Sequence, residues 1–281
     1  MKVVLIVSIF LAWISLAFSG MKMRTSDKEA QAEFAKHEIG LVVKDLNYQG
    51  NKLHYVKVGS DSLPTLFFLH GSPGSWNAFK SYLLDSDLRK KFRMIAIDRP
   101  GFGYSDFGCS MSLYQQGLLI SKCIQCELNN KPFHLIGHSI GGPVVIQLAQ
   151  LHPLYYSSLV ILAGSISPYL EPKEPLRHIF NFGPLKILLP GAFRPSNREI
   201  ISFKKDLFLL DKNYSNLKMP ILFIHGSKDP LVSVDNVAYG FQKLKENSNV
   251  KKVIIDGANH FIPWEHFDTI KAQLLLLKTE N

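Results

Sequence analysis

The sequence predicts an α/β fold: a mostly parallel sheet with helices on both faces, an antiparallel hairpin at its amino-terminal side and a helical insertion between two strands. Three observations predict it. Short apolar segments alternate with longer segments of helical periodicity, which is typical of parallel strands joined by helices. A hairpin pattern precedes this alternation, and one long segment without a strand pattern interrupts it.

Residues 41–58 carry the hairpin pattern. Apolar residues recur along residues 41–48 and again along residues 53–58, and Gln49, Gly50 and Asn51 lie between them. Gly and Asn between two apolar segments are typical of a tight reversal of the chain. We therefore expect two antiparallel strands here.

Six further apolar segments are candidate strands. They span residues 65–69, 94–97, 133–136, 158–162, 221–224 and 250–255. Helical patterns span residues 76–88, 112–128, 142–151, 234–244 and 264–277. Parallel neighbours need connections of this length, so we expect these strands to run parallel.

The segment from about residue 165 to residue 218 interrupts the alternation. It contains helical fragments separated by Pro and Gly, and it holds more large apolar residues than a solvent loop would. We expect it to cover another part of the protein. Arg177, Arg194 and Arg198 are interspersed in it and would suit a weakly anionic or amphiphilic substrate.

The charge pattern argues against several classes of function. The 281 residues hold 32 Lys and Arg against 23 Asp and Glu, a net charge of +9, but the basic residues are mostly scattered. The densest run, residues 89–93, follows a helical pattern and predicts a solvated helix end. No nucleic-acid motif, metal-ligand spacing or phosphate loop is present in the sequence. We expect no nucleic-acid partner, no metal and no cofactor.

The amino terminus has the pattern of a targeting segment. Residues 3–18 are sixteen uncharged, largely apolar residues, and Ala17 and Ser19 are the small residues of a cleavage site before Gly20. This pattern predicts a signal peptide and an exported protein, periplasmic or extracellular, that begins at Gly20. The alternative is an uncleaved membrane anchor, because the run nearly reaches spanning length.

The chain is therefore expected to have three parts. Residues 1–19 are the signal peptide or anchor, residues 20–40 are a linker, and residues 41–281 form the α/β domain with its insertion.

The three cysteines are too few for a disulfide scaffold. Cys123 and Cys126 have the spacing of a redox pair, but such pairs place the first thiol at a helix amino terminus. Here Ser112 and Gln115 form a capping-box pattern that starts the helix well before them. We expect both cysteines to be packed core thiols without a role in activity.

A candidate nucleophile lies at a predicted turn from strand to helix. The strand over residues 133–136 runs into Gly137-His138-Ser139-Ile140-Gly141 and then into a helical pattern. A serine at such a turn projects outward, and the two glycines allow close approach of the backbone. Because a serine hydroxyl is a poor nucleophile alone, Ser139 needs a base.

Two later loops contain suitable partners. Asp229 follows the strand over residues 221–224, and His260 follows the strand over residues 250–255. The carboxyl ends of parallel strands meet at one edge of a sheet, where ligands are expected. We therefore expect Ser139, Asp229 and His260 to converge as a catalytic triad.

With its serine, acid and histidine in this order, the chain resembles the α/β-hydrolase superfamily from about residue 41 to residue 277. His70-Gly71-Ser72-Pro73-Gly74 is similar to that family's oxyanion loop, and residues 98–105 are similar to its next strand-end loop. In that family the inserted segment forms a cap over the nucleophile.

The resemblance implies a role for each site residue. Ser139 attacks, His260 transfers the proton and Asp229 orients His260. The backbone N–H groups of Ser72 and Ile140 stabilise the oxyanion. Epoxide hydrolases and haloalkane dehalogenases in the same superfamily have a carboxylate where this chain has Ser139, which disfavours their chemistry.

Other polar residues near these motifs are expected to be structural. His70, His138 and His225 are expected to pack or to bond within their loops. Asp98 and Arg99 are expected to form a buried pair that holds its loop.

The sequence therefore predicts a serine hydrolase that cleaves a carboxylic ester or a related acyl compound of small size. It leaves open esterase, lipase, thioesterase, lactonase and carbon–carbon hydrolase activity, and the oligomeric state. An acyltransferase or perhydrolase would use the same acyl-enzyme, and a non-catalytic binding protein could use the same fold. The complete triad pattern favours an enzyme.

Overall fold

The computed structural model describes residue 8 and residues 23–172, 174–183, 185 and 189–280. Apart from Ser8, the predicted signal peptide or anchor lies outside the described residues. Within the described ranges, no helix is both long enough and apolar enough to cross a bilayer.

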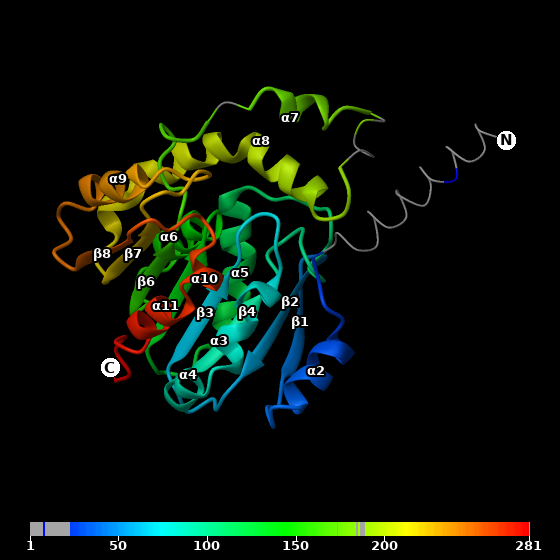
Figure 1. Cartoon of the computed structure of the whole chain (residues 1–281), viewed down its shortest axis with the longest axis vertical. Coiled ribbons are helices and arrows are strands. Elements are labelled where there is room, and N and C mark those ends of the chain that lie inside the picture. Colours follow the sequence, from blue (N-terminus) through cyan, green and yellow to red (C-terminus); the bar gives the residue numbers. More distant parts are fainter. Residues whose placement is uncertain (1–7, 9–22, 173, 184, 186–188, 281) are drawn as a thin grey trace.

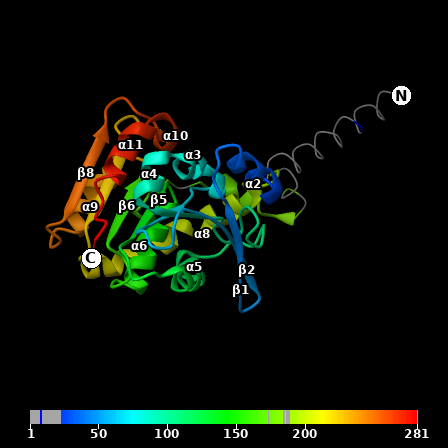
Figure 2. The same ribbon diagram turned by 90° about the horizontal axis from the view of Figure 1, so that it is seen from below.

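One sheet forms the centre of the molecule (Figure 1). Its strands are β1 (Val42–Tyr48), β2 (Asn51–Val58), β3 (Thr65–Leu69), β4 (Arg93–Ile97), β5 (Phe133–His138), β6 (Ser158–Leu162), β7 (Ile221–Gly226) and β8 (Val250–Ile255). They lie in the order β1-β2-β4-β3-β5-β6-β7-β8. β2 pairs antiparallel with β1 and β4, and the other neighbours are parallel. The predicted fold class is confirmed, with the hairpin at the edge opposite β8 (Figure 2).

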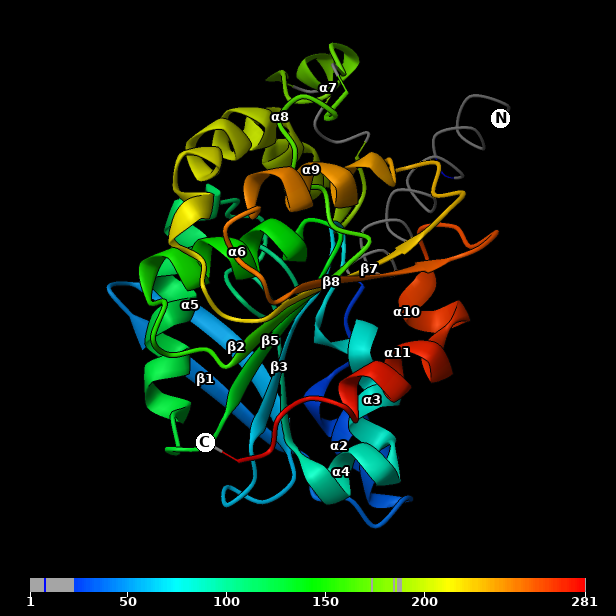
Figure 3. The same ribbon diagram turned by 90° about the vertical axis from the view of Figure 1, so that its left-hand side faces the viewer.

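Helices cover both faces of the sheet (Figure 3). One face carries α5 (Leu113–Glu127), α6 (Gly141–Leu151) and α9 (Asp235–Lys243), and α8 (Phe193–Leu210) packs on α5 and α6. The other carries α2 (Asp27–Ala35), α3 (Lys80–Leu84), α4 (Ser86–Lys91), α10 (Ile262–Glu265) and α11 (Phe267–Leu274). Successive residues of a strand point to opposite faces, so Phe67 and Phe68 of β3 enter two different core clusters. A strand buried on both sides reads as a continuous apolar segment, which explains the sequence pattern.

Two predicted helices are divided in the structure. The helix expected over residues 76–88 consists of η1 (Trp76–Phe79), α3 and α4. Asp85 is extended, and its carboxylate accepts hydrogen bonds from the backbone N–H groups of Asp87 and Leu88, which caps α4. The helix expected over residues 264–277 begins at Ile262 and restarts at Phe267.

The segment expected as a linker, residues 20–40, contains helix α2. Ser26 and Glu29 form a capping box at its start. Ala30 and Phe34 are buried, and the Phe34 ring centroid lies 6.3 Å from that of Trp76. The described part of this segment, residues 23–40, therefore packs against the core.

The insertion lies beyond the carboxyl ends of the strands and holds no strand among its described residues. Its described residues include α7 (Leu176–Ile179), α8 and η3 (Asp211–Asn216), with α7 furthest from the sheet (Figure 1). Phe203, Leu207 and Leu210 of α8 are buried in the core cluster that includes α6. The insertion therefore packs on the sheet domain, and we call it the cap.

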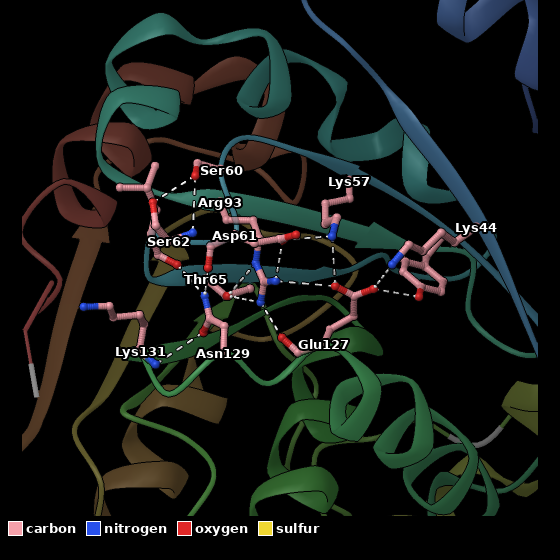
Figure 4. Close-up of polar contacts among 12 residues, drawn as sticks. Lys44, Lys57, Ser60, Asp61, Ser62, Thr65, Arg93, Glu127, Asn129 and Lys131 are labelled. Atoms are coloured by element: carbon pink, nitrogen blue, oxygen red, sulfur yellow. Dashed lines mark hydrogen bonds and ion pairs between the residues drawn. The ribbon is translucent and has the colours of Figure 1, made fainter.

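The basic run over residues 89–93 is only partly a solvated helix end. Arg89 and the two lysines after it form the last turn of α4, as expected, but Arg93 begins β4 and is buried. Its guanidinium donates to the backbone carbonyl oxygen of Glu127, whose carboxylate also binds Lys44 and Lys57 (Figure 4). We call these four residues the Glu127 cluster. It lies at the amino ends of β3 and β4.

The two helix cysteines differ in burial. Cys123 is buried as predicted, whereas the prediction is wrong for Cys126, which is exposed. At 3.6 residues per turn, Cys126 lies about 120° around α5 from Ile120, the centre of the buried stripe. It therefore falls just outside that stripe.

Candidate active site

Ser139 lies at the turn between β5 and α6, with a backbone φ of 55°. This left-handed region is uncommon for a residue with a Cβ and marks a strained turn. The Ser139 N–H donates a hydrogen bond to the carbonyl oxygen of Leu162 at 2.9 Å, which fixes the turn to β6.

The glycines on either side of Ser139 are required by close backbone approach. A Cβ on Gly137 would lie 2.2 Å from the carbonyl oxygen of Gly141. A Cβ on Gly141 would lie 2.3 Å from the carbonyl oxygen of Leu69. Because both obstacles are backbone atoms, no side-chain movement would relieve them. This is the arrangement that the sequence pattern predicts.

Asp229 and His260 meet at the carboxyl edge of the sheet. Nδ1 of His260 donates to Oδ2 of Asp229 at 2.7 Å, and the other carboxylate oxygen accepts from the backbone N–H groups of Leu231 and Val232. Burial favours the neutral carboxyl, but hydrogen bonds from His225, His260 and the Val232 N–H outweigh it and hold the pKa of Asp229 below its usual value. Asp229 is therefore an ionised, oriented acceptor.

Ser139 and His260 line one cavity of about 930 Å³, together with Gly71, Ser72 and Ile140. Asp229 is bonded to His260 and is not part of the cavity lining. In the described structure no hydrogen bond joins the Ser139 hydroxyl to His260, and in ligand-free enzymes such a bond often forms only when substrate binds. All five predicted site residues thus belong to one site. Among the described residues no His, Cys, Asp and Glu side chains group as metal ligands.

The two candidate oxyanion donors are the backbone N–H groups of Ser72 and Ile140. Neither has a hydrogen-bond acceptor within the described part of the chain. Ile140 precedes the first residue of α6, where helix N–H groups are left free and favour negative charge. Both N–H groups are therefore available to a substrate oxygen.

His138 supports the candidate base, a contact that sequence reasoning missed. Its Nε2 donates to the carbonyl oxygen of His260 at 3.1 Å, and its ring packs between His260 and Trp264. Burial lowers the pKa of His138 to about 3, and the neighbouring His260 acts in the same direction. A neutral His138 is thus a buried donor, as the expectation of a packed histidine requires.

Asp98 and Arg99 are buried but do not pair with each other, which corrects the prediction. Asp98 accepts from the backbone N–H groups of Trp76 and Tyr104 and is bonded to His54. Arg99 pairs instead with Glu199 of the cap. Consecutive residues of an extended segment point in opposite directions, so sequence adjacency was a poor guide to this contact.

Two segments far apart in the sequence also contribute to the cavity wall. The cap contributes Glu171, Arg177 and the α8 residues Phe193, Ile200 and Phe203. Of the three cap arginines, Arg177 therefore reaches the cavity, whereas Arg198 donates to the carbonyl oxygen of Gly108.

Met23 and Arg24, at the start of the continuous described chain, also line the cavity. Nothing in the sequence pattern connects these two residues to the triad.

Comparison with known proteins agrees with this architecture. A family model described as "alpha/beta hydrolase fold" matches residues 64–186 and 185–267. Epoxide hydrolase 4 of Mus musculus is 30% identical over 115 residues, which are 40% of this chain and 32% of that protein. The chain thus spans about a third of the length of the curated relatives that match in this way.

Two further matches cover more of the chain. A 2-hydroxy-6-oxononadienedioate/2-hydroxy-6-oxononatrienedioate hydrolase of Paraburkholderia phymatum is 24% identical over 80% of this chain and 90% of that protein. The solved structure of a bacterial membrane phospholipase A has a TM-score of 0.64 and 18% identity, and the match covers 98% of both chains. At this identity the second match shows a shared fold.

Proposed function

The chain belongs to the alpha/beta hydrolase fold family, and from this premise we propose that it is a hydrolase that cleaves a carboxylic ester through an acyl-enzyme on Ser139. One observation carries the proposal: the Asp229–His260 hydrogen bond of 2.7 Å at the cavity that Ser139 lines from a strained turn. Epoxide opening is disfavoured because a serine takes the nucleophile position.

Each group has a defined part in the proposed reaction. Because Nδ1 of His260 bonds to Asp229, Nε2 is left to accept the Ser139 proton. The Ser139 oxygen bonds to the ester carbonyl carbon, and the negative charge that moves to the carbonyl oxygen is stabilised by the Ser72 and Ile140 N–H groups. The carbon–oxygen bond to the alcohol breaks, and His260 gives the leaving alcohol its proton. Water then repeats both steps and releases the acid.

The residues at the mouth of the cavity support the proposal that the substrate is an ester with a long apolar part. A volume of about 930 Å³ is at the upper end of small-ligand sites. Five large apolar side chains line the cavity and are also exposed, which gives it an apolar rim: Met23, Phe193, Leu231, Phe261 and Trp264. An apolar surface of this kind suits a lipid ester.

The attachment of the chain beside this mouth favours a membrane-anchored enzyme. Arg24 donates to the carbonyl oxygen of Gly103, and Asn77 donates to the Thr25 hydroxyl, so the segment next to Met23 is fixed to the sheet domain. Residue 18, the end of the apolar run, precedes Met23 by five residues, which reach about 18 Å at most. We therefore propose that residues 3–18 are a retained anchor that holds the mouth at a lipid surface. The name of the membrane phospholipase A fits this proposal.

The nucleophile is tested with a fluorophosphonate probe and a panel of esters of increasing acyl length. Ser139→Ala should abolish labelling and lower ester turnover by at least about a thousandfold, with an unchanged circular dichroism spectrum. His260→Ala should lose a similar amount, since the two residues act together. Labelling of the Ser139→Ala protein would refute the assignment.

Carbon–carbon hydrolysis is the second candidate. It is favoured by the match to the Paraburkholderia hydrolase over 90% of that protein. Adding the substrate named for that hydrolase to the ester panel distinguishes carbon–carbon hydrolysis from ester hydrolysis. Adding an alcohol or peroxide to the ester assay reveals an acyltransferase or perhydrolase by its product.

A further inference from the structure

Arg99 makes a set of contacts that the proposed reaction does not use. It follows β4, is fully buried, and uses all five N–H groups of its guanidinium. Nε donates to the carbonyl oxygen of His70 at 2.8 Å, and Nη2 donates to that of Gly71 at 3.0 Å. The remaining bonds go to the Gln116 amide oxygen and to both carboxylate oxygens of Glu199.

The hydrogen bond from Arg99 to the Gly71 carbonyl oxygen sets the direction of the Ser72 N–H, the candidate oxyanion donor, because both groups belong to one planar peptide. The peptide between Gly71 and Ser72 is trans, so its C=O and its N–H point in opposite directions. Holding the Gly71 oxygen on Arg99 therefore aims the Ser72 N–H away from Arg99. The loop lies against the nucleophile, because a Cβ on Gly71 would be 3.0 Å from the Cβ of Ser139.

Arg99 also acts on the same oxygen through His70. The backbone N–H of Arg99 donates to Nε2 of His70 at 2.9 Å, which leaves Nδ1 as the protonated nitrogen. That Nδ1 donates to the Gly71 oxygen at 2.6 Å. Two donors thus fix one carbonyl group, and both depend on Arg99.

The cap supplies the charge that holds Arg99. Glu199 of α8 is buried, and it also accepts from the Gln116 side-chain amide at 2.8 Å. The same helix contributes cavity wall through Ile200, the next residue, and Phe203, one turn later. A ligand that contacts this part of α8 therefore contacts the helix that carries Glu199, the partner of Arg99.

We infer that Arg99 and Glu199 are positioning residues that couple the cap to the oxyanion hole: α8 contacts the substrate, and its Glu199 sets the direction of the Ser72 N–H through Arg99. The inference rests on the proposed function, because the donor concerned stabilises the tetrahedral intermediate. A buried ion pair adds little to stability compared with an apolar pair of similar size, so stability alone does not account for this pair.

The test compares three variants of the full chain on a short-chain, water-soluble ester. Glu199→Gln keeps the side-chain shape and removes the charge. Its kcat should fall about tenfold or more, while KM changes by less than about twofold, because the lost interaction acts in the transition state. Affinity for phenylboronic acid, whose serine adduct is tetrahedral, should fall in parallel with kcat.

Two controls separate positioning from stability. Glu127→Gln removes the carboxylate charge of the Glu127 cluster (Figure 4), which lies at the amino ends of β3 and β4, and should lower the unfolding temperature without lowering kcat. Arg99→Met/Glu199→Leu replaces the ion pair with an apolar pair and should recover stability relative to Glu199→Gln, but its kcat should stay low.

Two results would overturn the inference: an unchanged kcat in Glu199→Gln, or recovery of kcat together with stability in the double variant. Fluorophosphonate labelling of the unmodified protein distinguishes a failure of the inference from a failure of the proposed function. If the unmodified protein neither labels nor cleaves esters, the proposed function and the inference both fail. If the unmodified protein is labelled and cleaves esters, the kcat values of the variants decide whether the inference holds.

Discussion

Strain at a single residue organises the site. Ser139 adopts a φ of 55° because its N–H is bonded to Leu162 and its own carbonyl oxygen accepts from Gly142. Left-handed backbone costs an L-residue about 1 to 2 kcal/mol, and the surrounding contacts must offset this. This backbone conformation turns the Ser139 side chain out of the regular side-chain directions of β5 and α6 and toward the cavity.

The ionised carboxylate of Asp229 predicts a graded loss on mutation. Asp229→Asn should lower kcat by about 10⁴-fold and His260→Ala by about 10⁶-fold, because the amide still occupies the space but no longer stabilises the protonated imidazole. Steady-state kinetics on one ester measures both. An Asp229→Asn enzyme with full turnover would place the acid elsewhere.

Buried His134 predicts acid sensitivity of the fold. Burial lowers its pKa to about 4, so between that value and the unfolded pKa of about 6.5 the unfolded chain binds more protons. Stability is therefore retained at neutral pH and lost as pH falls through this window. His134→Gln, which does not titrate, should reduce the stability lost between pH 7.5 and pH 5 by up to about 2 kcal/mol.

Urea unfolding at the two pH values measures this difference. An equal loss in the variant and the unmodified protein would exclude His134 as the group responsible.

At the scale of elements, the junction of β5 and α6 depends on its glycines. Gly137→Ala would place a Cβ 2.2 Å from the Gly141 carbonyl oxygen, so the helix start must shift and the Ser139 turn is lost. We expect little folded, active protein. Gly40→Ala is the matched control, because a Cβ there meets nothing within 4 Å. Soluble yield and probe labelling measure the outcome, and a labelled Gly137→Ala protein would contradict it.

Helix α5 predicts unequal reactivity of its two thiols. Burial raises the pKa of Cys123, whereas Cys126 and Cys109 are exposed. The folded protein should therefore take up two maleimide groups, and the unfolded protein three, by intact mass. A Cys123→Ser/Cys126→Ser variant should keep its activity, since α5 does not line the cavity. Inactivity of this variant when well folded would refute the structural role.

At the scale of the whole molecule, the amino-terminal segment should matter for lipid esters but not for soluble ones. Deleting residues 1–19 changes the net charge only from +9 to +8 and leaves the Arg24 and Thr25 contacts. The shortened chain should cleave a short soluble ester at the normal rate and lose at least about tenfold on an ester embedded in phosphatidylcholine vesicles.

Leu154→Ser is the control for this experiment, because Leu154 is exposed at the other end of the sheet and should affect neither rate. Equal loss on both esters would contradict the anchor proposal. Intact mass of the protein from its native host gives a second answer, since a mass that lacks residues 1–19 would show cleavage at Gly20.

The sequence by itself determined the fold class, the strand positions and the identity of the candidate triad. These depend on local rules: buried parallel strands read as apolar segments, a sharp turn needs glycine at Gly137 and Gly141, and loops after parallel strands share an edge. For the same reason the capping pattern placed the start of α5 correctly.

Only the tertiary structure decided which distant residues complete the site. Glu199 lies a hundred residues from Arg99, and Met23 lies still further from His260, and no period or spacing relates them. Their contacts arise because the cap and the amino-terminal segment fold over the same edge of the sheet. Buried charges such as Arg99 must find a partner wherever the chain brings one, and that choice is made by packing rather than by sequence proximity.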